Sequence, residues 1–368
     1  DGTRPNTIDN TKITNVNIYG GTFDCSPPPT IPDIQNVYKA TAIEIGVGSS
    51  YVNIKQITFQ DVRHQSGSAR GAIFGRSASS HIDVDHCTVI NTDGAAIHGG
   101  GGVIFSGKYC NVTNSRFIDL YDAYIAFDNA FYCTGKNNLL INSVDAGGGT
   151  LNEVGNLVQF SQGAKSCSFE DNDLIGISGH GISMFSSSAE NHHNSITNNR
   201  LDGGGYTSAG TASYFIIGDE YTRDTIVENN QLWNPSNTGG GTALIRFYPR
   251  NNIINDNNIS DLDDTRNRST QVCYGIHIRF DDDPIETFTA TGNTIIAGHS
   301  GLFFSAGDYL DTKHMILENN EIIADTQDGT NKALYAVNIS NTGTKYIRIN
   351  DNSYQGTFTS DWAGTWPY

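Results

Sequence analysis

The chain is poor in basic residues and in the residue types that build long helices. Its 368 residues include 22 Lys and Arg against 39 Asp and Glu, which gives a formal net charge of −17, and it has only 2 Met and 3 Trp. A protein that binds nucleic acid needs a basic face to neutralise phosphates, so this charge argues against a nucleic-acid partner. We expect a soluble protein whose partner is uncharged or is recognised locally.

The sequence also lacks any apolar run of about 18 residues, the length that a membrane-spanning helix requires. Its N-terminus, DGTRPNTIDN, has no basic segment followed by an apolar one, so we expect no membrane insertion and no export signal, as in a fragment or a processed form. No CxxC pair occurs that would indicate a zinc site. We predict buried thiols, without a disulfide framework, at Cys25, Cys87, Cys110, Cys133, Cys167 and Cys273.

Glycine is abundant, with 40 residues, and Asn, Thr, Ser and Ile are frequent, a composition typical of strands and turns. One short frame recurs, as in LENNEI at 317–322: an apolar residue, an asparagine at the fourth position and an apolar residue at the sixth. It fits Leu139/Asn142/Val144, Phe169/Asn172/Leu174, Ile196/Asn199/Leu201, Val227/Asn230/Leu232, Ile254/Asn257/Ile259, Ala290/Asn293/Ile295, Leu317/Asn320/Ile322 and Ile349/Asn352/Tyr354. The mean period of about 30 residues indicates a repeat architecture.

Four earlier segments fit the same frame with a small or apolar residue in place of asparagine: Ile18/Gly21/Phe23, Ile54/Ile57/Phe59, Val84/Cys87/Val89 and Val112/Ser115/Phe117. From the second repeat onward, a second strand precedes each frame and usually begins with Gly or Ala, as in GISMFS at 181–186. Strands that repeat in one direction, with no helical pattern between them, predict an all-β, single-stranded parallel β-helix of about 12 rungs. We assign residues 1–356 to this single domain and 357–368 to a C-terminal tail or cap.

The repeated asparagines have a structural explanation. Asparagines at the same corner of successive rungs can hydrogen-bond to the turn backbone and to the asparagines above and below. We therefore interpret Asn142, Asn172 and their counterparts as scaffold residues. Three longer connections, 145–155, 203–212 and 261–273, precede Gly- or Ala-led strands, and we expect them to project from one edge and to build a binding face.

The side chains that alternate with apolar residues in the Gly-led strands should form an outward file. Arg246, Arg250, His277 and Arg279 fall together on two neighbouring rungs of a chain that is otherwise poor in basic residues. Charged groups and a ring along one line suit an extended polar polymer such as a glycan. The substrate-binding residues that we predict are Glu153, Arg246, Tyr248, Arg250, His277, Arg279, Gln159 and His98.

Glycoside hydrolysis uses two carboxyl groups, about 5–5.5 Å apart for retention and roughly 6.5–9.5 Å apart for inversion. We predict catalytic roles for Asp219, Glu220 and Asp128, and favour the Asp219/Glu220 region because Arg246 follows one rung later. Counting rungs places Asp128 three rungs from Asp219, too far for a pair unless the side chains lean together, so Asp122 or Glu153 is a better partner for it. Each acid could instead be a solvated or Arg-paired surface group.

A lyase would need a base near a uronate carboxylate and a cation that neutralises that carboxylate. His98, His180, His277, Tyr132, Lys136, Arg246 and Arg279 supply such groups without a fixed spacing. The acidic runs 263–264 and 281–283 follow no calcium-loop pattern, so we predict no metal site and no cofactor, with Ca²⁺ only as the ion that a lyase would use.

The segments GISMFSSS…SITNNRL and ALIRFYPRNNIINDNNI carry a family resemblance. From Ile13 to Tyr354 the pattern resembles the right-handed parallel β-helix superfamily of carbohydrate-active proteins, which includes bacteriophage tailspike depolymerases, pectate-lyase-like polysaccharide lyases and mannuronan epimerases. The resemblance implies a right-handed coil and a polysaccharide ligand. It transfers no catalytic residue, because no motif of the lyases or epimerases occurs here and a fold does not fix a function.

Among these proteins the chain looks most like a tailspike, because it is acidic, poor in lysine and without an export signal. That resemblance implies an endo-acting glycoside hydrolase for bacterial surface polysaccharide, capsule or O-antigen, in a virion tail or otherwise outside the cell. It also implies a homotrimer, with Trp362, Trp366 and Tyr368 as a trimer contact or a cap. Two alternatives stay open: a polysaccharide lyase or epimerase acting on a uronate-containing glycan, and a non-catalytic glycan-binding adhesin.

Overall fold

The structure is a computed structural model, and it is described for part of the chain. The described residues are 12–24, 41–60, 71–90, 101–120, 123–142, 156–177, 179–203, 214–233, 242–260, 273–280, 286–297, 300–306, 315–324, 335–339, 347–356 and 360–363. In these ranges the regular structure consists of strands, and no helix occurs that could cross a membrane.

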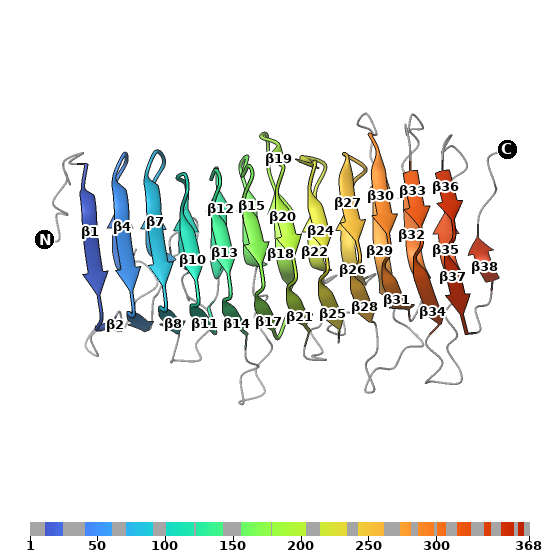
Figure 1. The fold of residues 1–368 in the computed structure, drawn as a ribbon, viewed down its shortest axis with the longest axis horizontal. Helices are drawn as coiled ribbons and strands as arrows, with labels where there is room; N and C mark the ends of the chain where they lie inside the picture. Colours follow the sequence, from blue (N-terminus) through green and yellow to red (C-terminus); the bar gives the residue numbers. More distant parts are fainter. Residues whose placement is uncertain are drawn as a thin grey trace, which may run out of the picture.

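Three parallel sheets of twelve strands each run along the molecule, and the chain passes through them in turn (Figure 1). Sheet A contains β1 (Thr14–Tyr19), β4 (Ser50–Lys55), β7 (Ser80–Asp85), β10 (Asn111–Thr113), β13 (Thr134–Lys136), β16 (Ser168–Glu170), β20 (Ser195–Thr197), β24 (Ile226–Glu228), β27 (Asn252–Asn255), β30 (Phe288–Thr291), β33 (Met315–Glu318) and β36 (Ile347–Asn350). Sheet B contains β2 (Thr22–Asp24), β5 (Thr58–Gln60), β8 (Thr88–Ile90), β11 (Arg116–Ile118), β14 (Leu139–Ile141), β17 (Asp173–Ile175), β21 (Arg200–Asp202), β25 (Gln231–Trp233), β28 (Asn258–Ser260), β31 (Thr294–Ala297), β34 (Glu321–Ala324) and β37 (Ser353–Gln355).

Sheet C contains the strands that the sequence marks with a leading Gly or Ala. They are β3 (Ile43–Ile45), β6 (Gly71–Gly75), β9 (Gly101–Phe105), β12 (Ile125–Asp128), β15 (Asn156–Ser161), β18 (His180–Phe185), β22 (Tyr214–Gly218), β26 (Thr242–Phe247), β29 (Cys273–Phe280), β32 (Ser300–Ala306), β35 (Tyr335–Ile339) and β38 (Ser360–Ala363). Two short strands, β19 (Asn191–His192) and β23 (Thr222–Arg223), pair beside sheet A. The predicted all-β parallel β-helix is confirmed.

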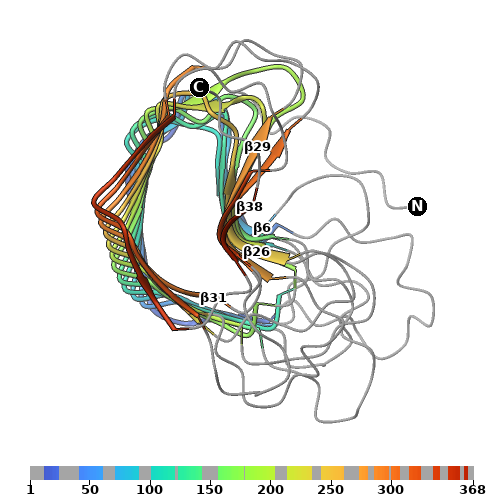
Figure 2. The same cartoon turned by 90° about the vertical axis from the view of Figure 1, so that its right-hand side faces the viewer.

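One continuous hydrophobic core fills the space that the three sheets enclose (Figure 2). In sheet C, Ile182, Ile216 and Ile245 lie in register on successive strands, and all three are fully buried. Burying each such side chain stabilises the fold by about 1.5–3 kcal/mol. Because side chains alternate along a strand, the residues between these positions face outward, and that outward surface of sheet C carries the candidate site.

An asparagine ladder holds the corner between sheets A and B. The backbone N–H and the side-chain Nδ2 of Asn199 both donate to Oδ1 of Asn230, over 2.9 Å and 3.0 Å, while Nδ2 also donates to the carbonyl of Phe169. The same pattern connects Asn138, Asn172, Asn199, Asn230, Asn257, Asn293, Asn320 and Asn352. These residues satisfy the buried corner, which confirms their scaffold role.

The assignment of Asn142 to this ladder was wrong. Its Nδ2 donates to the carbonyl of Gly176 at 2.9 Å, and Asn138 occupies the ladder position instead. The frame was misplaced because Gly135 stands where the pattern requires an apolar residue. A Cβ at Gly135 would meet the ring of Phe169 at 2.7 Å, so that ring fills the space of the missing side chain.

Cys87, Cys110, Cys133 and Cys167 are buried free thiols, as the sequence predicted. The side chains of Cys25 and Cys273 lie outside the described residues. The C-terminal strand β38 falls in the segment assigned to a tail or cap, and it pairs in parallel with β35, so residues 360–363 continue sheet C. Connection 145–155, Trp366 and Tyr368 lie outside the described ranges. Of connections 203–212 and 261–273, only the end residues 203 and 273 are described.

Candidate functional site

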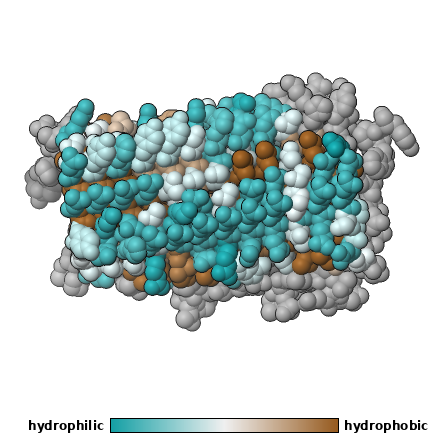
Figure 3. Space-filling view, viewed as in Figure 1, coloured by the Kyte–Doolittle hydropathy of each residue, from teal (hydrophilic) through white to brown (hydrophobic). Residues whose placement is uncertain are grey.

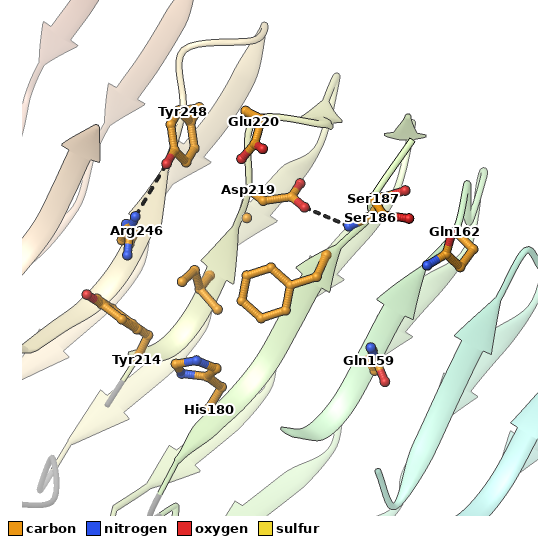
Figure 4. A pocket seen from close by; sticks show the side chains of 13 residues that line it. Gln159, Gln162, His180, Ser186, Ser187, Tyr214, Asp219, Glu220, Arg246 and Tyr248 are labelled. Atoms are coloured by element: carbon orange, nitrogen blue, oxygen red, sulfur yellow. Dashed lines mark hydrogen bonds between the residues drawn. The ribbon is translucent and has the colours of Figure 1, made fainter. Parts of the chain in front are cut away.

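A groove of about 500 Å³ opens on the outer surface of sheet C (Figure 4). It extends over β15, β18, β22 and β26. Its lining residues are Gln159, Gln162, His180, Phe185, Ser186, Ser187, Tyr214, Ile217, Gly218, Asp219, Glu220, Arg246 and Tyr248. The opposite face of the rod, formed by sheets A and B, is predominantly hydrophilic (Figure 3).

The register of sheet C explains why polar groups gather in the groove. Gln159, Ser183, Ile217 and Arg246 occupy one outward position on successive strands. At the end of β22, Gly218 lies inward, where a Cβ would meet the ring of Phe247 at 2.6 Å. The glycine therefore lets the strand end close to the core, and it places two acidic residues at the rim of the groove.

Asp219 is buried and accepts three hydrogen bonds. Its Oδ2 accepts the backbone N–H of Ser186 at 2.6 Å, and its Oδ1 accepts the N–H of Tyr221 at 3.0 Å and the hydroxyl of Thr222 at 3.1 Å. The residue as a whole is 9% exposed. Burial raises its pKa to about 6 although the three donors favour the charged form, and the neighbouring Glu220 adds to the rise. Asp219 thus holds a proton closer to neutral pH than an ordinary aspartate does.

Glu220 lies next to Asp219 and also lines the groove. It is half-buried, and Figure 4 shows its carboxyl between Asp219 and Tyr248. The two acids that the sequence selected therefore share one wall of one groove.

Arg246 faces the groove between two tyrosine rings. Its guanidinium carbon lies 5.0 Å from the ring centre of Tyr214 and 5.9 Å from that of Tyr248, whose hydroxyl is 3.4 Å from one of its NH₂ groups. The Nε atom is buried and has no hydrogen-bond partner. Within the described ranges, no carboxylate forms an ion pair with Arg246. The groove therefore presents a cation that its own acids do not neutralise.

His180 also lines the groove, and its ring contacts that of Tyr214, with ring centres 5.3 Å apart. Its Nδ1 is also buried without a partner. Burial, and to a smaller extent the charge of Arg246, lower the pKa of the imidazole to about 4. His180 is therefore a neutral ring at neutral pH and can donate or accept one hydrogen bond at the open nitrogen.

The other predicted site residues lie beside the groove. His277 follows Arg246 in register, and burial, together with Arg246 and Arg279, lowers its pKa to about 3. Arg279 is exposed, with its guanidinium 5.8 Å from the ring centre of Tyr248. Arg250 donates its backbone N–H to the Tyr248 carbonyl, and neither it nor His277 nor Arg279 lines the groove.

Asp128 also lies outside the groove. Its Oδ1 accepts the hydroxyl of Ser161 at 2.9 Å. The register puts Asp128 three strands from Asp219, roughly 14 Å at the usual strand spacing, as rung counting predicted. Glu153 and His98 lie outside the described residues, as do Asp122 and the acidic runs 263–264 and 281–283.

The sequence analysis did not select Tyr214, Gln162, Phe185, Ser186 and Ser187, and it considered His180 only as a lyase base. Tyr214 and His180 are paired in register at the start of their strands, three residues before the outward Ile217 and Ser183. Strict alternation from those positions points both rings inward, so the outward file did not identify them. Ser186 and Ser187 follow β18 in a turn for which the repeat gives no signal. Among the described residues, no group of three or more His, Cys, Asp or Glu could hold a metal ion.

No family model and no curated protein matches the sequence. Solved structures do share the fold at low identity. PfbA, a surface adhesin of Streptococcus pneumoniae, is similar with a TM-score of 0.60 and 11% identity over 92% of this chain and 82% of that one. The A-module of the mannuronan C-5 epimerase AlgE4 of Azotobacter vinelandii is similar with a TM-score of 0.53 and 14% identity over 97% of this chain and 90% of that one.

A mutant tailspike protein of the E. coli bacteriophage HK620, in complex with a pentasaccharide, is similar with a TM-score of 0.55 and 13% identity. The match covers 82% of this chain and 53% of that one, so the chain spans about half the length of the tailspike chain. At these identities the comparisons show a common fold and leave the reaction open.

Proposed function

We propose that this protein is an endo-acting glycoside hydrolase that cleaves a polysaccharide bound in the groove of sheet C. The observation that carries the proposal is the pair of carboxyl groups, Asp219 and Glu220, at one wall of a groove that also offers a cation, two tyrosine rings and two glutamines. Charged and amide groups bind sugar hydroxyls, while rings pack against sugar faces. The groove is open to the side of a rod, which suits attack within a long chain.

In this proposal Asp219 is the general acid. Its pKa of about 6 keeps a fraction protonated near neutral pH, and Oδ2 accepts only one hydrogen bond, which leaves a lone pair for the proton. The proton passes to the glycosidic oxygen as the bond to the anomeric carbon breaks. Glu220, as a carboxylate, then either activates the water that attacks this carbon or attacks the carbon itself to give an intermediate that water hydrolyses.

The similar structures support a glycan ligand. They include a tailspike in complex with a pentasaccharide, a mannuronan epimerase and a surface adhesin. We therefore propose a bacterial surface polysaccharide, capsule or O-antigen, as the substrate and a tailspike-type homotrimer outside the cell as the working form. Sedimentation of the purified chain tests the trimer, and a panel of bacterial polysaccharides with mass analysis of products tests the substrate.

The variants Asp219→Asn and Glu220→Gln test the catalytic pair. Each removes one ionisable group, and we expect each to lower the rate of product release by at least about 100-fold with unchanged thermal unfolding, since general acid–base catalysis contributes roughly 10²–10⁴-fold. Glu190→Gln is the matched control, because Glu190 is an exposed acid paired with Arg223 outside the groove. Full activity in both groove variants would rule out this pair.

A lyase or epimerase is the second candidate, and a specific observation favours it. His180 is a neutral imidazole with a free Nδ1 in the same groove as Arg246. Such a base could remove the proton next to a uronate carboxylate. A lyase would release unsaturated products that absorb in the ultraviolet, an epimerase would invert a sugar centre without cleavage, and a hydrolase would release reducing ends without unsaturation. A non-catalytic adhesin would bind the glycan and release nothing.

A further inference from the structure

Three buried side-chain polar atoms in the described part of the chain have no hydrogen-bond partner: Thr41 Oγ1, His180 Nδ1 and Arg246 Nε. Two of these three atoms belong to residues that line the groove of sheet C, His180 and Arg246. A buried polar atom without a partner costs about 1–3 kcal/mol, and more when the group is charged. Two such atoms beside one groove indicate that a bound ligand supplies the hydrogen-bond partners that the protein does not provide.

The protein holds the Arg246 cation in place without pairing it. Among the described residues, the guanidinium contacts the rings of Tyr214 and Tyr248 and the Tyr248 hydroxyl, which are neutral. Of the two groove acids, Asp219 already accepts hydrogen bonds on both oxygens, from Ser186 on the neighbouring rung and from its own turn. The other acid, Glu220, forms no ion pair with Arg246. In the described part of the chain, Arg76, Arg200 and Arg223 pair with acids, whereas Arg246 does not.

The shape of the site selects the kind of anion. Figure 4 shows Tyr248 on one side of Arg246 and Tyr214 on the other, so a ligand reaches the guanidinium along its edge. A planar carboxylate matches that edge, because its two oxygens can accept from Nε and from one NH₂ group in parallel. His180 stays neutral beside the cation, and its Nδ1 suits a hydroxyl of the same sugar.

We propose that Arg246 Nε and His180 Nδ1 form a subsite for a monosaccharide unit that carries a carboxylate, so that the bound polysaccharide is an acidic one. This inference rests on the proposed function only in taking a glycan as the ligand, and it holds for hydrolysis, elimination or binding alone. Sulfate and phosphate share the negative charge but are tetrahedral, and the experiment separates them from carboxylate.

The test measures binding by titration calorimetry in the Glu220→Gln variant, so that no turnover is required. The probes are uronate oligosaccharides of several linkages, each paired with its carboxyl-reduced counterpart, and sulfated oligosaccharides of the same length. We expect at least one uronate oligosaccharide to bind, and its reduced or sulfated counterpart to bind at least 10-fold more weakly. Binding of no uronate probe, or equal binding of a probe and its reduced counterpart, would overturn the proposal.

The second arm tests the residues. Introducing Arg246→Gln into the Glu220→Gln protein should weaken uronate binding at least 10-fold and abolish the preference for the uronate probe over its reduced counterpart. Arg246→Lys should keep only part of this preference. Arg200→Gln is the control, because Arg200 is an exposed arginine on sheet B paired with Asp173. An Arg246→Gln protein that still prefers the uronate would place the subsite elsewhere. If uronates bind but no glycan is cleaved by the unmodified protein, the hydrolase proposal fails and this one stands.

Discussion

Asp219, which is buried just after β22, and His277, which is partly buried on β29, are titratable residues that affect stability in opposite directions. The pKa of Asp219 is raised from 3.8 to about 6, so its folded form keeps a proton that the unfolded chain releases. Its contribution is therefore fully favourable below pH 3.8 and declines as the pH rises to about 6. The pKa of His277 is lowered from 6.5 to about 3, so the unfolded chain binds a proton that the folded protein excludes as the pH falls below 6.5.

We predict that His277→Gln makes the protein more resistant to acid. At pH 4 the unfolded form of the parent gains about 3 kcal/mol from protonating His277, at 1.36 kcal/mol per pH unit below 6.5. Glutamine cannot be protonated and can keep the hydrogen bond to Ser305, which lies 2.6 Å from His277 Nε2. Denaturant unfolding at pH 7 and pH 4 should show a smaller loss of unfolding free energy in the variant.

His81→Gln is the control for this experiment, because it removes an exposed imidazole that stacks on Tyr51 and Tyr109. It should keep the pH dependence of the parent. Equal losses in His277→Gln and in the parent would show that protonation of His277 does not limit the acid stability of the fold.

At the residue scale, the sequence identified the acids of the groove but not their surroundings. Asp219, Glu220, Arg246, Tyr248 and Gln159 could be selected because alternation fixes which side chains face outward and charge marks the unusual ones. The missing partner of Arg246 could not be foreseen, because pairing depends on side-chain directions that spacing does not give. The donors to Asp219 come from the turn residues Ser186 and Tyr221 and from Thr222 in the short strand β23, none of which the repeat constrains.

At the element scale, the asparagine ladder is the feature that the sequence predicted best. Asn recurs at one corner because both of its amide atoms are needed there. In Asn230 the Oδ1 accepts from Asn199 of the preceding rung, and the Nδ2 donates to a carbonyl of that rung and to Asn257 of the next one. The single misplaced member, Asn142, arose where a glycine makes room for Phe169 from the neighbouring rung. The sequence pattern of one rung cannot show which side chain of an adjacent rung fills the space beside it.

We predict that Asn230→Ala destabilises the protein by at least about 3 kcal/mol. The change leaves the N–H of Asn199 and the carbonyls of Ile196 and Glu228 without partners in a buried corner, at about 1–3 kcal/mol each. Asn258→Ala, at an exposed position of β28, should change stability by no more than about 0.5 kcal/mol. Denaturant unfolding of both variants measures this difference, and similar stabilities would show that the ladder is dispensable.

At the scale of the whole molecule, each rung contacts its two neighbours and little else, as the strand pairing shows. Such a rod has stability that is close to a sum over rungs and their interfaces. The repeat period and the alternation were enough to predict this architecture. The groove was harder to predict, because its two acids follow the end of β22 at Gly218, one residue earlier than the neighbouring β18 ends, and the repeat does not show this difference.

A consequence is that one complete rung can be removed. In the parent, Lys108 lies beside Ser80 on the next rung. Deleting Ser80–Gly107 therefore joins Ser79 to Lys108, which takes the place of Ser80. The deletion removes β7, β8 and β9, one strand from each sheet, and brings β4, β5 and β6 against β10, β11 and β12. Every inward side chain of the remaining strands keeps its direction, and the groove, which begins at β15, is untouched.

We predict that this shortened protein folds into a rod that is one rung shorter, by about 5 Å, and unfolds cooperatively at a somewhat lower temperature than the parent. Deleting only Ser80–Ile90 is the control: it removes fewer residues but takes β7 and β8 and leaves β9, so the winding of the chain through the three sheets is broken. Circular dichroism, thermal unfolding and limited proteolysis compare the two. We expect the full-rung deletion to keep its β-structure and its protease resistance, and the shorter deletion to lose both. Equal disruption by the two deletions would mean that the rungs are not interchangeable units.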